Sequence, residues 1–307
     1  MNLLEIKNVE KKFGGKTVLD GLNLAVPEGS IFGFVGENGA GKTTTMKLIL
    51  GLEEVTTGEI TINKEPVIFG HTKTNHYTGY LPDVPEFYGY MRGREYLQLC
   101  GEITGIPKQK LATKMEEMLE LVGLAAEKKF IRSYSRGMKQ RLGIAQALLN
   151  EPRLLICDEP TSALDPSGRQ EFLALLASLR GKVTILFSTH ILSDVERICD
   201  YVGILHQGKL AVSSPLATLK ELHAHRQIEI LVEKQQDKLI ELLQTLQQQH
   251  LIQSFSQKEE AVVVRYEGSY EELLPHLFRG FMEKKITPEM LRKVEPSLEQ
   301  IFLEVIK

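Results

Sequence analysis

A glycine-rich segment, GENGAGKTT from Gly36 to Thr44, carries the residue types that bind phosphate groups. Its glycines let the main chain wrap closely around an anion with N–H groups pointing inward. Lys42 supplies positive charge to terminal phosphates, and the Thr43 hydroxyl suits a Mg²⁺ ligand. A β-rich run precedes the segment and a helical pattern follows it, which is the context that GxxxxGK[ST] requires. We therefore expect a phosphate-binding loop rather than a glycine-rich turn without a ligand.

A second candidate is LLICDEP, where an apolar run beginning at Leu154 ends in two carboxylates. The apolar residues predict a strand that is buried on both faces, and ligand crevices of α/β sheets lie at such strand ends. Asp158 is placed there to hold Mg²⁺, and Glu159 to orient an attacking water. An Asp-Glu pair after a strand is more often a polar loop, so this interpretation depends on the phosphate loop upstream. We interpret Cys157 as a small buried hydrophobe rather than a nucleophile.

The segment SYSRGMKQRLGIAQALL, from Ser133 to Leu149, predicts a helix that begins near Ser135 or Gly137. Free N–H groups at a helix N-terminus bind anions. The ordinary alternative is that Ser135 is only an N-cap. This segment is therefore a second candidate anion site, about a hundred residues after the first.

Together these motifs resemble those of an ABC-type ATPase cassette, over roughly residues 3 to 215 and in the family's order. In that resemblance Gly36–Thr44 is the Walker A motif, Leu154–Asp158 the Walker B motif, YSRGMKQR the signature, and Ser162-Ala163-Leu164-Asp165 the D-loop. His190, at the end of TILFSTH, resembles the switch histidine. The tail EPSLEQIFLEVI resembles the ends of bacterial ATP-binding subunits that serve separately encoded exporter-type permeases.

The resemblance implies that two cassettes pack head to tail, with each ATP between one Walker A motif and the other cassette's signature. It makes Glu159 and His190 catalytic. Asp83 stands where the family usually has Gln, and it becomes a metal ligand together with Thr43 and Asp158. The residues implied in ATP binding are Phe13, Val18, Gly36, Asn38, Gly39, Ala40, Gly41, Lys42, Thr43, Thr44, Ser135, Gly137 and Met138.

Three of these positions keep ordinary structural alternatives. Phe13 would stack on adenine according to the resemblance, but an aromatic residue there also suits core packing. A lone histidine after an apolar strand, such as His190, is usually structural. Asp83 precedes Val84-Pro85 and also suits the cap of a turn.

The elements expected to position these residues alternate between strands and helices. Residues 3–13 and 17–26 show strand patterns, and apolar strands precede Gly36 and Asp158 with helical patterns after them. Residues 88 to 132 show the residue patterns of helical segments. The expected fold class is therefore α/β, the phosphate-loop ABC ATPase fold, with a mixed sheet, flanking helices, a β subdomain and an inserted helical subdomain.

The composition shifts after Ser213-Ser214-Pro215, where RQIEILVE, LIQSFSQ and AVVVRY predict strands with helices between them. We expect two domains. An ABC ATPase nucleotide-binding domain covers 1–215 and contains the helical subdomain 88–132, and a small C-terminal accessory α/β domain covers 222–307.

Composition argues against several classes of protein. The net charge of −3 offers no basic field for nucleic acid. Cys100, Cys157 and Cys199 are scattered without a CxxC pair, which argues against a disulfide framework or a zinc site and favours a reducing cytosol. The sequence shows neither a signal-peptide pattern nor about 18 consecutive uncharged apolar residues, so we expect any role at a membrane to need a partner.

The resemblance thus implies an ATPase subunit of an ABC transporter, an exporter, that uses ATP and Mg²⁺. Its expected partners are an integral membrane permease subunit and a second cassette, as a homodimer, without nucleic acid. Its expected location is cytoplasmic, peripheral on the inner face of the cell membrane through the permease. The alternative is a soluble ABC ATPase acting on nucleic acid or the ribosome. Translation-factor members usually carry two cassettes, whereas this sequence has one Walker A motif.

Overall fold

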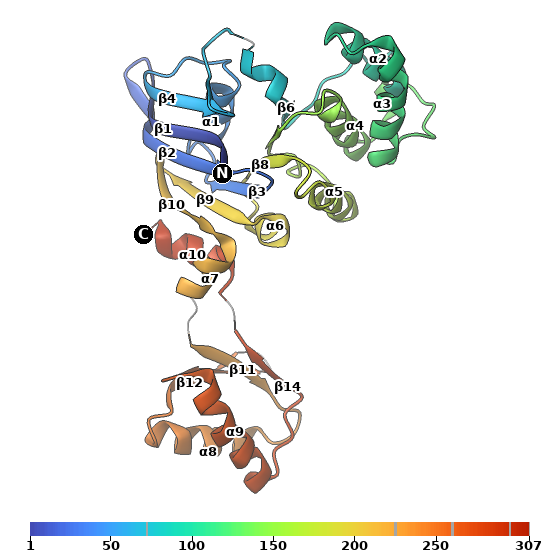
Figure 1. Cartoon of the computed structure of the whole chain (residues 1–307). Helices are drawn as coiled ribbons and strands as arrows, with labels where there is room; N and C mark the ends of the chain where they lie inside the picture. Colours follow the sequence, from blue (N-terminus) through green and yellow to red (C-terminus); the bar gives the residue numbers. More distant parts are fainter. Residues whose placement is uncertain (72, 224–225, 259–260, 295, 307) are drawn as a thin grey trace. The chain divides into compact units, whose positions relative to one another are not determined.

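The computed structural model describes residues 1–71, 73–223, 226–258, 261–294 and 296–306 (Figure 1). The chain divides into two compact units, Met1–Leu216 with Phe302–Lys307, and Ala217–Ile301. Sequence reasoning placed the accessory domain at 222–307, whereas the residues from Phe302 onward group with the first unit. The boundary between Ile301 and Phe302 falls inside the last helix, whose apolar spacing continues across it. The sequence pattern therefore does not show where one unit ends and the other begins.

A six-stranded sheet is the centre of the first unit, and its order is β10-β9-β3-β8-β7-β6. β10 runs antiparallel to β9, and the other neighbours are parallel. All residues of β3, β7 and β8 are buried, as predicted for the run from Leu154. The strands are β3 (Ile31–Gly36), β6 (Thr78–Leu81), β7 (Leu154–Asp158), β8 (Thr184–Thr189), β9 (Tyr201–His206) and β10 (Lys209–Pro215).

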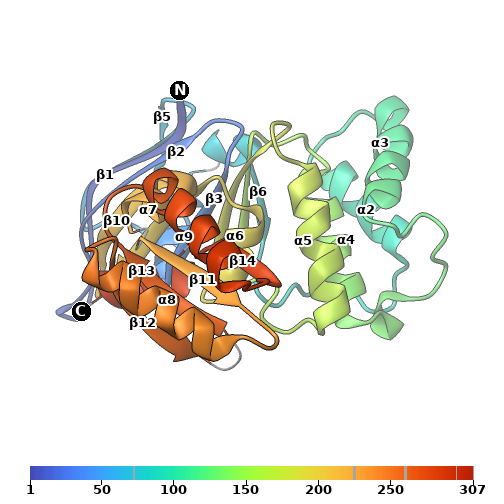
Figure 2. The same ribbon diagram turned by 90° about the horizontal axis from the view of Figure 1, so that it is seen from below.

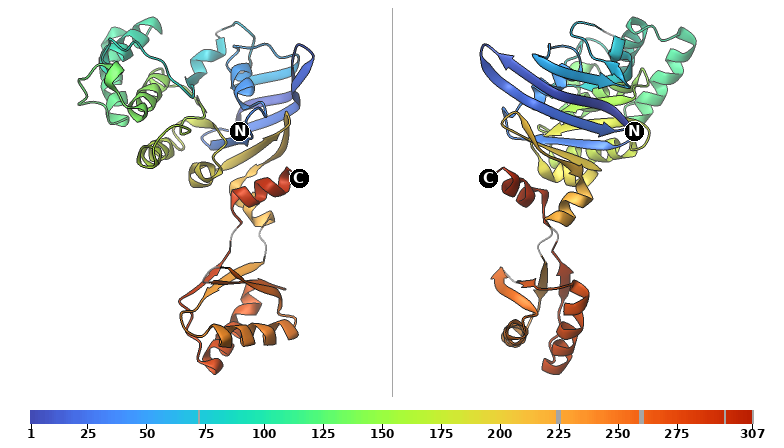
Figure 3. Two further views of the ribbon diagram at one scale, coloured as in Figure 1. Left: turned by 180° about the vertical axis from the view of Figure 1, so that it is seen from behind. Right: turned by 60° about the vertical axis from the view of Figure 1, so that its left-hand side comes forward.

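An antiparallel sheet, in the order β2-β1-β4-β5, forms the β subdomain (Figure 3). Its strands are β1 (Asn2–Phe13), β2 (Lys16–Pro27), β4 (Thr57–Ile62) and β5 (Glu65–Pro66). Helix α1 (Lys42–Ile49) joins the two sheets through one hydrophobic core, in which Met46 packs with Phe34 of β3 and Ile60 of β4 among others. The helix that follows the phosphate loop is therefore anchored on both sides.

Helices cover the opposite face of the central sheet. α6 (Leu192–Ile198) packs so closely on β3 that a Cβ atom added at Gly33 would lie 2.5 Å from Val195 Cγ1. α5 (Pro166–Ser178) contacts both α6 and α4 (Arg136–Leu148) (Figure 2). The inserted helical segments are α2 (Gly93–Ile103) and α3 (Lys108–Leu121), which contact α4, and the short 3-10 helices are η1 (Lys73–Tyr77) and η2 (Ile131–Ser133).

The second unit is built on an antiparallel sheet in the order β12-β13-β11-β14. Its own core contains Ile228, Leu239, Val264 and Leu277, among others, all fully buried. Its elements are β11 (Gln227–Leu231), α8 (Gln236–Gln248), β12 (Ile252–Lys258), β13 (Ala261–Tyr266), α9 (Tyr270–Lys284) and β14 (Met290–Lys293). α7 (Leu216–Leu222) and α10 (Leu298–Val305) cross the boundaries between the units.

Among the helices of the described ranges, none combines the length and the apolar character that crossing a membrane requires.

Candidate active site

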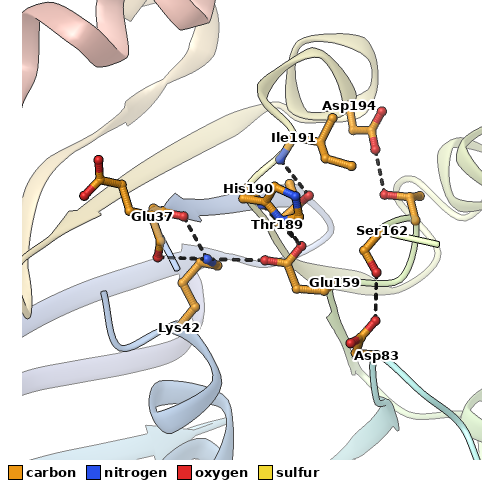
Figure 4. Close-up of polar contacts among 11 residues, drawn as sticks. Glu37, Lys42, Asp83, Glu159, Ser162, Thr189, His190, Ile191 and Asp194 are labelled. Atoms are coloured by element: carbon orange, nitrogen blue, oxygen red, sulfur yellow. Dashed lines mark hydrogen bonds and ion pairs between the residues drawn. The ribbon is translucent and has the colours of Figure 1, made fainter. Parts of the chain in front are cut away.

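Three strands of the central sheet lead into the candidate residues. β3 enters the phosphate loop, β7 ends at Asp158, and β8 ends at Thr189 just before His190. Because β3 and β7 both pair in parallel with β8, their carboxyl ends meet at the same edge of the sheet. Motifs that lie far apart in the sequence therefore form one site (Figure 4).

The phosphate loop adopts a conformation that selects glycine at several positions. Gly39 and Gly41 have φ values of 84° and 114°, which other residues rarely adopt. At Gly36 an added Cβ atom would lie 2.5 Å from the carbonyl oxygen of Leu205. Gly36 is thus required by close packing against the end of β9, and Gly39 and Gly41 by the backbone conformation of the loop.

Lys42 is the first residue of α1, directly after the glycines of this loop, and is only 6% exposed. Its ammonium donates hydrogen bonds to the carbonyls of Gly36 (2.7 Å) and Glu37 (3.2 Å). Beside it lies a cavity of about 220 Å³ lined by Val18, Asn38, Gly39, Gly41, Lys42, Thr43, Thr44 and Glu159. Val18 and most of the expected loop residues therefore share one cavity. Ala40, also expected there, is 8% exposed and donates its N–H to the Glu37 carbonyl.

Glu159 stands between Lys42 and His190. Its φ of 47° is unusual for a residue with a side chain, and its N–H donates to the Ser188 carbonyl at 2.9 Å. Oε1 lies 3.3 Å from the Lys42 ammonium, and Oε2 lies 2.8 Å from Nδ1 of His190 (Figure 4). The carboxylate is thus held on both sides, and its side chain is 15% exposed. Such a group can orient a water and accept its proton.

Asp158 is the best-suited magnesium ligand of the site. It is 3% exposed, and within the described residues no donor makes a hydrogen bond to its Oδ1 atom. Burial raises the pKa of Asp158, while the hydroxyls of Thr43 and Ser188 favour the charged form and lower it. A buried carboxylate oxygen without a partner, close to a threonine hydroxyl, is the donor set that a hard cation prefers. These residues therefore fit Mg²⁺.

Asp83 contacts the D-loop and α4. Its Oδ1 accepts a hydrogen bond of 2.8 Å from the hydroxyl of Ser162 (Figure 4). Its carbonyl oxygen accepts one of 2.7 Å from Nε2 of Gln140. Its side chain therefore faces the D-loop rather than a backbone N–H of the turn at Val84-Pro85. No set of three or more His, Cys, Asp or Glu side chains suited to a metal occurs in the part of the chain that the structure describes.

The signature residues line another cavity. Ser135 is the N-cap of α4, and its Oγ accepts the N–H of Met138 at 3.2 Å. The cavity, of about 260 Å³, lies where α4 and α5 begin, and its lining includes Ser135, Gly137, Ala163, Leu164 and Asp165. Within one chain, the signature and the phosphate loop thus line separate cavities.

Phe13 is 44% exposed at the end of β1, so it does not belong to the core. The Lys11 ammonium lies 4.5 Å from the centre of its ring, which is within range of a cation–π interaction. An aromatic ring that presents this much surface suits a stacking role better than the core-packing alternative.

Sequence reasoning missed a buried network behind the site. Asp194 of α6 is 2% exposed; it accepts hydrogen bonds from Thr161 Oγ1 (2.7 Å) and Arg169 Nε (2.6 Å). Thr161 follows Glu159 by two residues, and Asp194 follows His190 by four, so this network ties together the two loops that carry the catalytic pair. The available signal was an acidic residue that shares the buried face of a short helix with Val195 and Ile198.

Comparisons with known proteins agree with this geometry. The protein family described as "ABC transporter" matches residues 19–162. The bacitracin transport ATP-binding protein BcrA of Bacillus licheniformis is 43% identical over 222 residues, which cover 71% of this chain and 72% of that protein. The uncharacterized ABC transporter ATP-binding protein YxlF of Bacillus subtilis is 35% identical over 99% of both chains.

A solved structure of an ATP-binding subunit of an ABC transporter superposes with a TM-score of 0.65 at 33% identity, covering 72% of this chain and 92% of that one. The likeness therefore holds in sequence and in fold. The chain belongs to the ATP-binding subunits of ABC transporters, and it is an ATPase whose hydrolysis is coupled to transport.

Proposed function

We propose that this chain is the motor of an exporter whose permease is a separate polypeptide. The observation that carries the proposal is the arrangement of Glu159 between Lys42 and His190. Their contacts hold a carboxylate beside a phosphate loop. Two relatives named for bacitracin and lantibiotic transport support a role in transport, and the resemblance of the tail EPSLEQIFLEVI to exporter-type subunits supports export as its direction. The chain would work on the cytoplasmic face of the membrane through that permease.

In hydrolysis Glu159 orients the attacking water and accepts its proton, while His190 fixes the carboxylate from the other side. Lys42 stabilises the negative charge of the terminal phosphates. Thr43 and Asp158 would hold Mg²⁺, which neutralises charge on the phosphate oxygens when it is bound. Phe13 would stack on adenine, and Val18 would lie near the ribose.

The second anion site suggests pairing of two identical chains. Ser135 and the N–H groups near Gly137 and Met138 would contact the ATP held by the partner chain, since Ser135 and Gly137 line a cavity separate from the phosphate loop. Arg136, next to Ser135, is exposed and would lie near the interface between the two chains. ATP would then close the two cassettes, and hydrolysis would reopen them.

A permease loop would enter the cleft beside the helical subdomain. This cleft, of about 280 Å³, is lined by Val84, Pro85, Glu86, Phe87, Gly89, Ile131, Arg132 and Lys139. Tyr88 and Tyr90 expose 53% and 69% of their surface next to it. Exposed aromatic and apolar side chains with a basic rim suit a protein segment that carries apolar and acidic residues.

Co-purification tests this proposal against an ATPase that acts on nucleic acid. Full-length chain, tagged and isolated from detergent-solubilised cells, is expected to retain a polytopic membrane protein after nuclease treatment. Replacing Val84 by Glu should reduce that recovery, because it adds a charge to the apolar wall of the cleft. Recovery of RNA in place of a membrane protein would support the alternative function.

A further inference from the structure

Asp83 lies where three functional segments meet. It follows β6 by two residues and directly precedes 84–87, which line the cleft proposed for the permease. Its carbonyl oxygen accepts a hydrogen bond from Gln140 of α4. Its carboxylate accepts one from Ser162 of the D-loop (Figure 4). One residue thus contacts the signature helix and the segment that follows Glu159.

The contact with α4 fixes the main chain of Asp83. Gln140 is 2% exposed, and its Nε2 donates to the Asp83 carbonyl at 2.7 Å. A buried amide that loses such a bond leaves a polar group without a partner, which is unfavourable. The backbone at residue 83 is therefore tied to the helix that begins at the signature.

The contact with Ser162 ties the D-loop to the same point. Ser162 is exposed, and its hydroxyl donates to the Asp83 carboxylate at 2.8 Å. The three residues after it, Ala163–Asp165, line the 260 Å³ cavity together with Ser135 and Gly137. A charge-assisted bond here restricts a loop that otherwise lies on the surface.

We propose that Asp83 is a positioning residue that acts through Ser162: it fixes the D-loop in the arrangement in which a second cassette docks. This inference rests on the proposed function, because it takes the pairing of two cassettes as given. Asp83 then contributes to pairing by preorganising the D-loop, since a loop that is already ordered loses less entropy on binding. Its carboxylate acts through the serine hydroxyl and not as a ligand of Mg²⁺.

The test is a double-mutant cycle on ATP-driven dimerisation of the full-length chain. In an E159Q background, the ATP concentration that gives half-maximal dimer is measured by light scattering after size-exclusion chromatography. Asp83→Ala and Ser162→Ala should each raise it about fivefold, the scale of one charge-assisted hydrogen bond at a partly exposed site. The double variant should be no worse than either single one, because both remove the same contact.

Conservative variants supply the controls. Ser162→Thr keeps the hydroxyl and Asp83→Asn keeps an acceptor oxygen, so both should stay within about twofold of the parent. Additive single effects would overturn the inference and leave the proposed function intact. So would an Mg²⁺ requirement that shifts in Asp83→Asn but not in Ser162→Ala, because that pattern marks a metal ligand. A parent that does not dimerise with ATP would remove the proposed function and this inference with it.

Discussion

At the scale of single residues, the site depends on how one carboxylate is held. Glu159 occupies a left-handed backbone conformation, with φ of 47°, directly after the buried strand β7. That conformation costs on the order of 1–3 kcal/mol and persists only where the surroundings enforce it. Here Lys42 and His190 lie on either side of the carboxylate and Ser188 binds the backbone N–H. The strain places Glu159 between the phosphate loop and the switch histidine.

Glu159→Gln should slow ATP turnover by roughly 100- to 10,000-fold, because the amide cannot accept a proton from water. ATP binding should persist, since Lys42 and the loop are unchanged and one negative charge near the triphosphate is removed. Steady-state phosphate release and equilibrium nucleotide binding measure the two effects separately. Glu59→Gln, on β4 and with a side chain 63% exposed, is the matched control and should keep normal turnover. Near-normal hydrolysis by Glu159→Gln would remove Glu159 from the catalytic role.

Asp194→Asn should lower the free energy of unfolding by about 3 kcal/mol, because it leaves Arg169 without its charged partner in a buried network. The side chain is 2% exposed and accepts from both Thr161 and Arg169. Denaturant unfolding of the full chain measures the change, with Glu59→Gln expected within about 0.5 kcal/mol of wild type. Equal stability of the two variants would contradict a structural role for the Asp194 network.

At the scale of elements, the sequence predicted the features that depend on residues close together in the chain. The apolar run before Asp158 predicted a strand buried on both faces, and β7 is one. The hairpin of β9 and β10 turns at Gln207-Gly208, where φ values of 47° and 79° allow a two-residue turn. The glycines at 36–41 revealed the position of the phosphate loop in the sequence, because the backbone of the loop requires glycine there.

Other features could not be predicted because distant residues create them. β6, of four residues, and β14, also of four, are too short for a periodic pattern and depend on pairing with β7 and β11. The bond between Asp83 and Ser162 joins residues 79 positions apart. Sequence reasoning placed Asp83 near the site from its family position but could not show which neighbour its carboxylate meets.

Ser135→Arg, at the start of α4, should abolish hydrolysis while changing ATP affinity by less than about threefold, because Ser135 would contact the nucleotide of the partner chain. Lys42→Ala should instead weaken ATP binding directly. Titration of each chain with a fluorescent ATP analogue, at concentrations where it is monomeric, compares the two. Equal losses of affinity would show that the signature binds ATP within its own chain.

At the scale of the whole molecule, each unit has its own hydrophobic core. The core of the first unit is built from residues between Leu3 and Leu210, and that of the second from residues between Ile228 and Leu291. Phe302–Lys307 group with the first unit, but the residues of its core cluster all precede 222. Deletion of 222–307 is therefore expected to leave a folded cassette that binds ATP within about threefold of the full chain. Circular dichroism and ATP titration check this expectation. An insoluble product would mean that the cassette needs the C-terminal segment for its core.

The central claim is that two chains build each hydrolytic site, and complementation tests it most directly. Lys42→Ala and Ser135→Arg chains are each expected to be inactive alone. In a mixed dimer, the intact phosphate loop of the Ser135→Arg chain faces the intact signature of the Lys42→Ala chain. An equimolar mixture should thus recover about a quarter of wild-type ATPase activity, since half the dimers are mixed and each has one complete site. A mixture no more active than the sum of its parts would contradict the account.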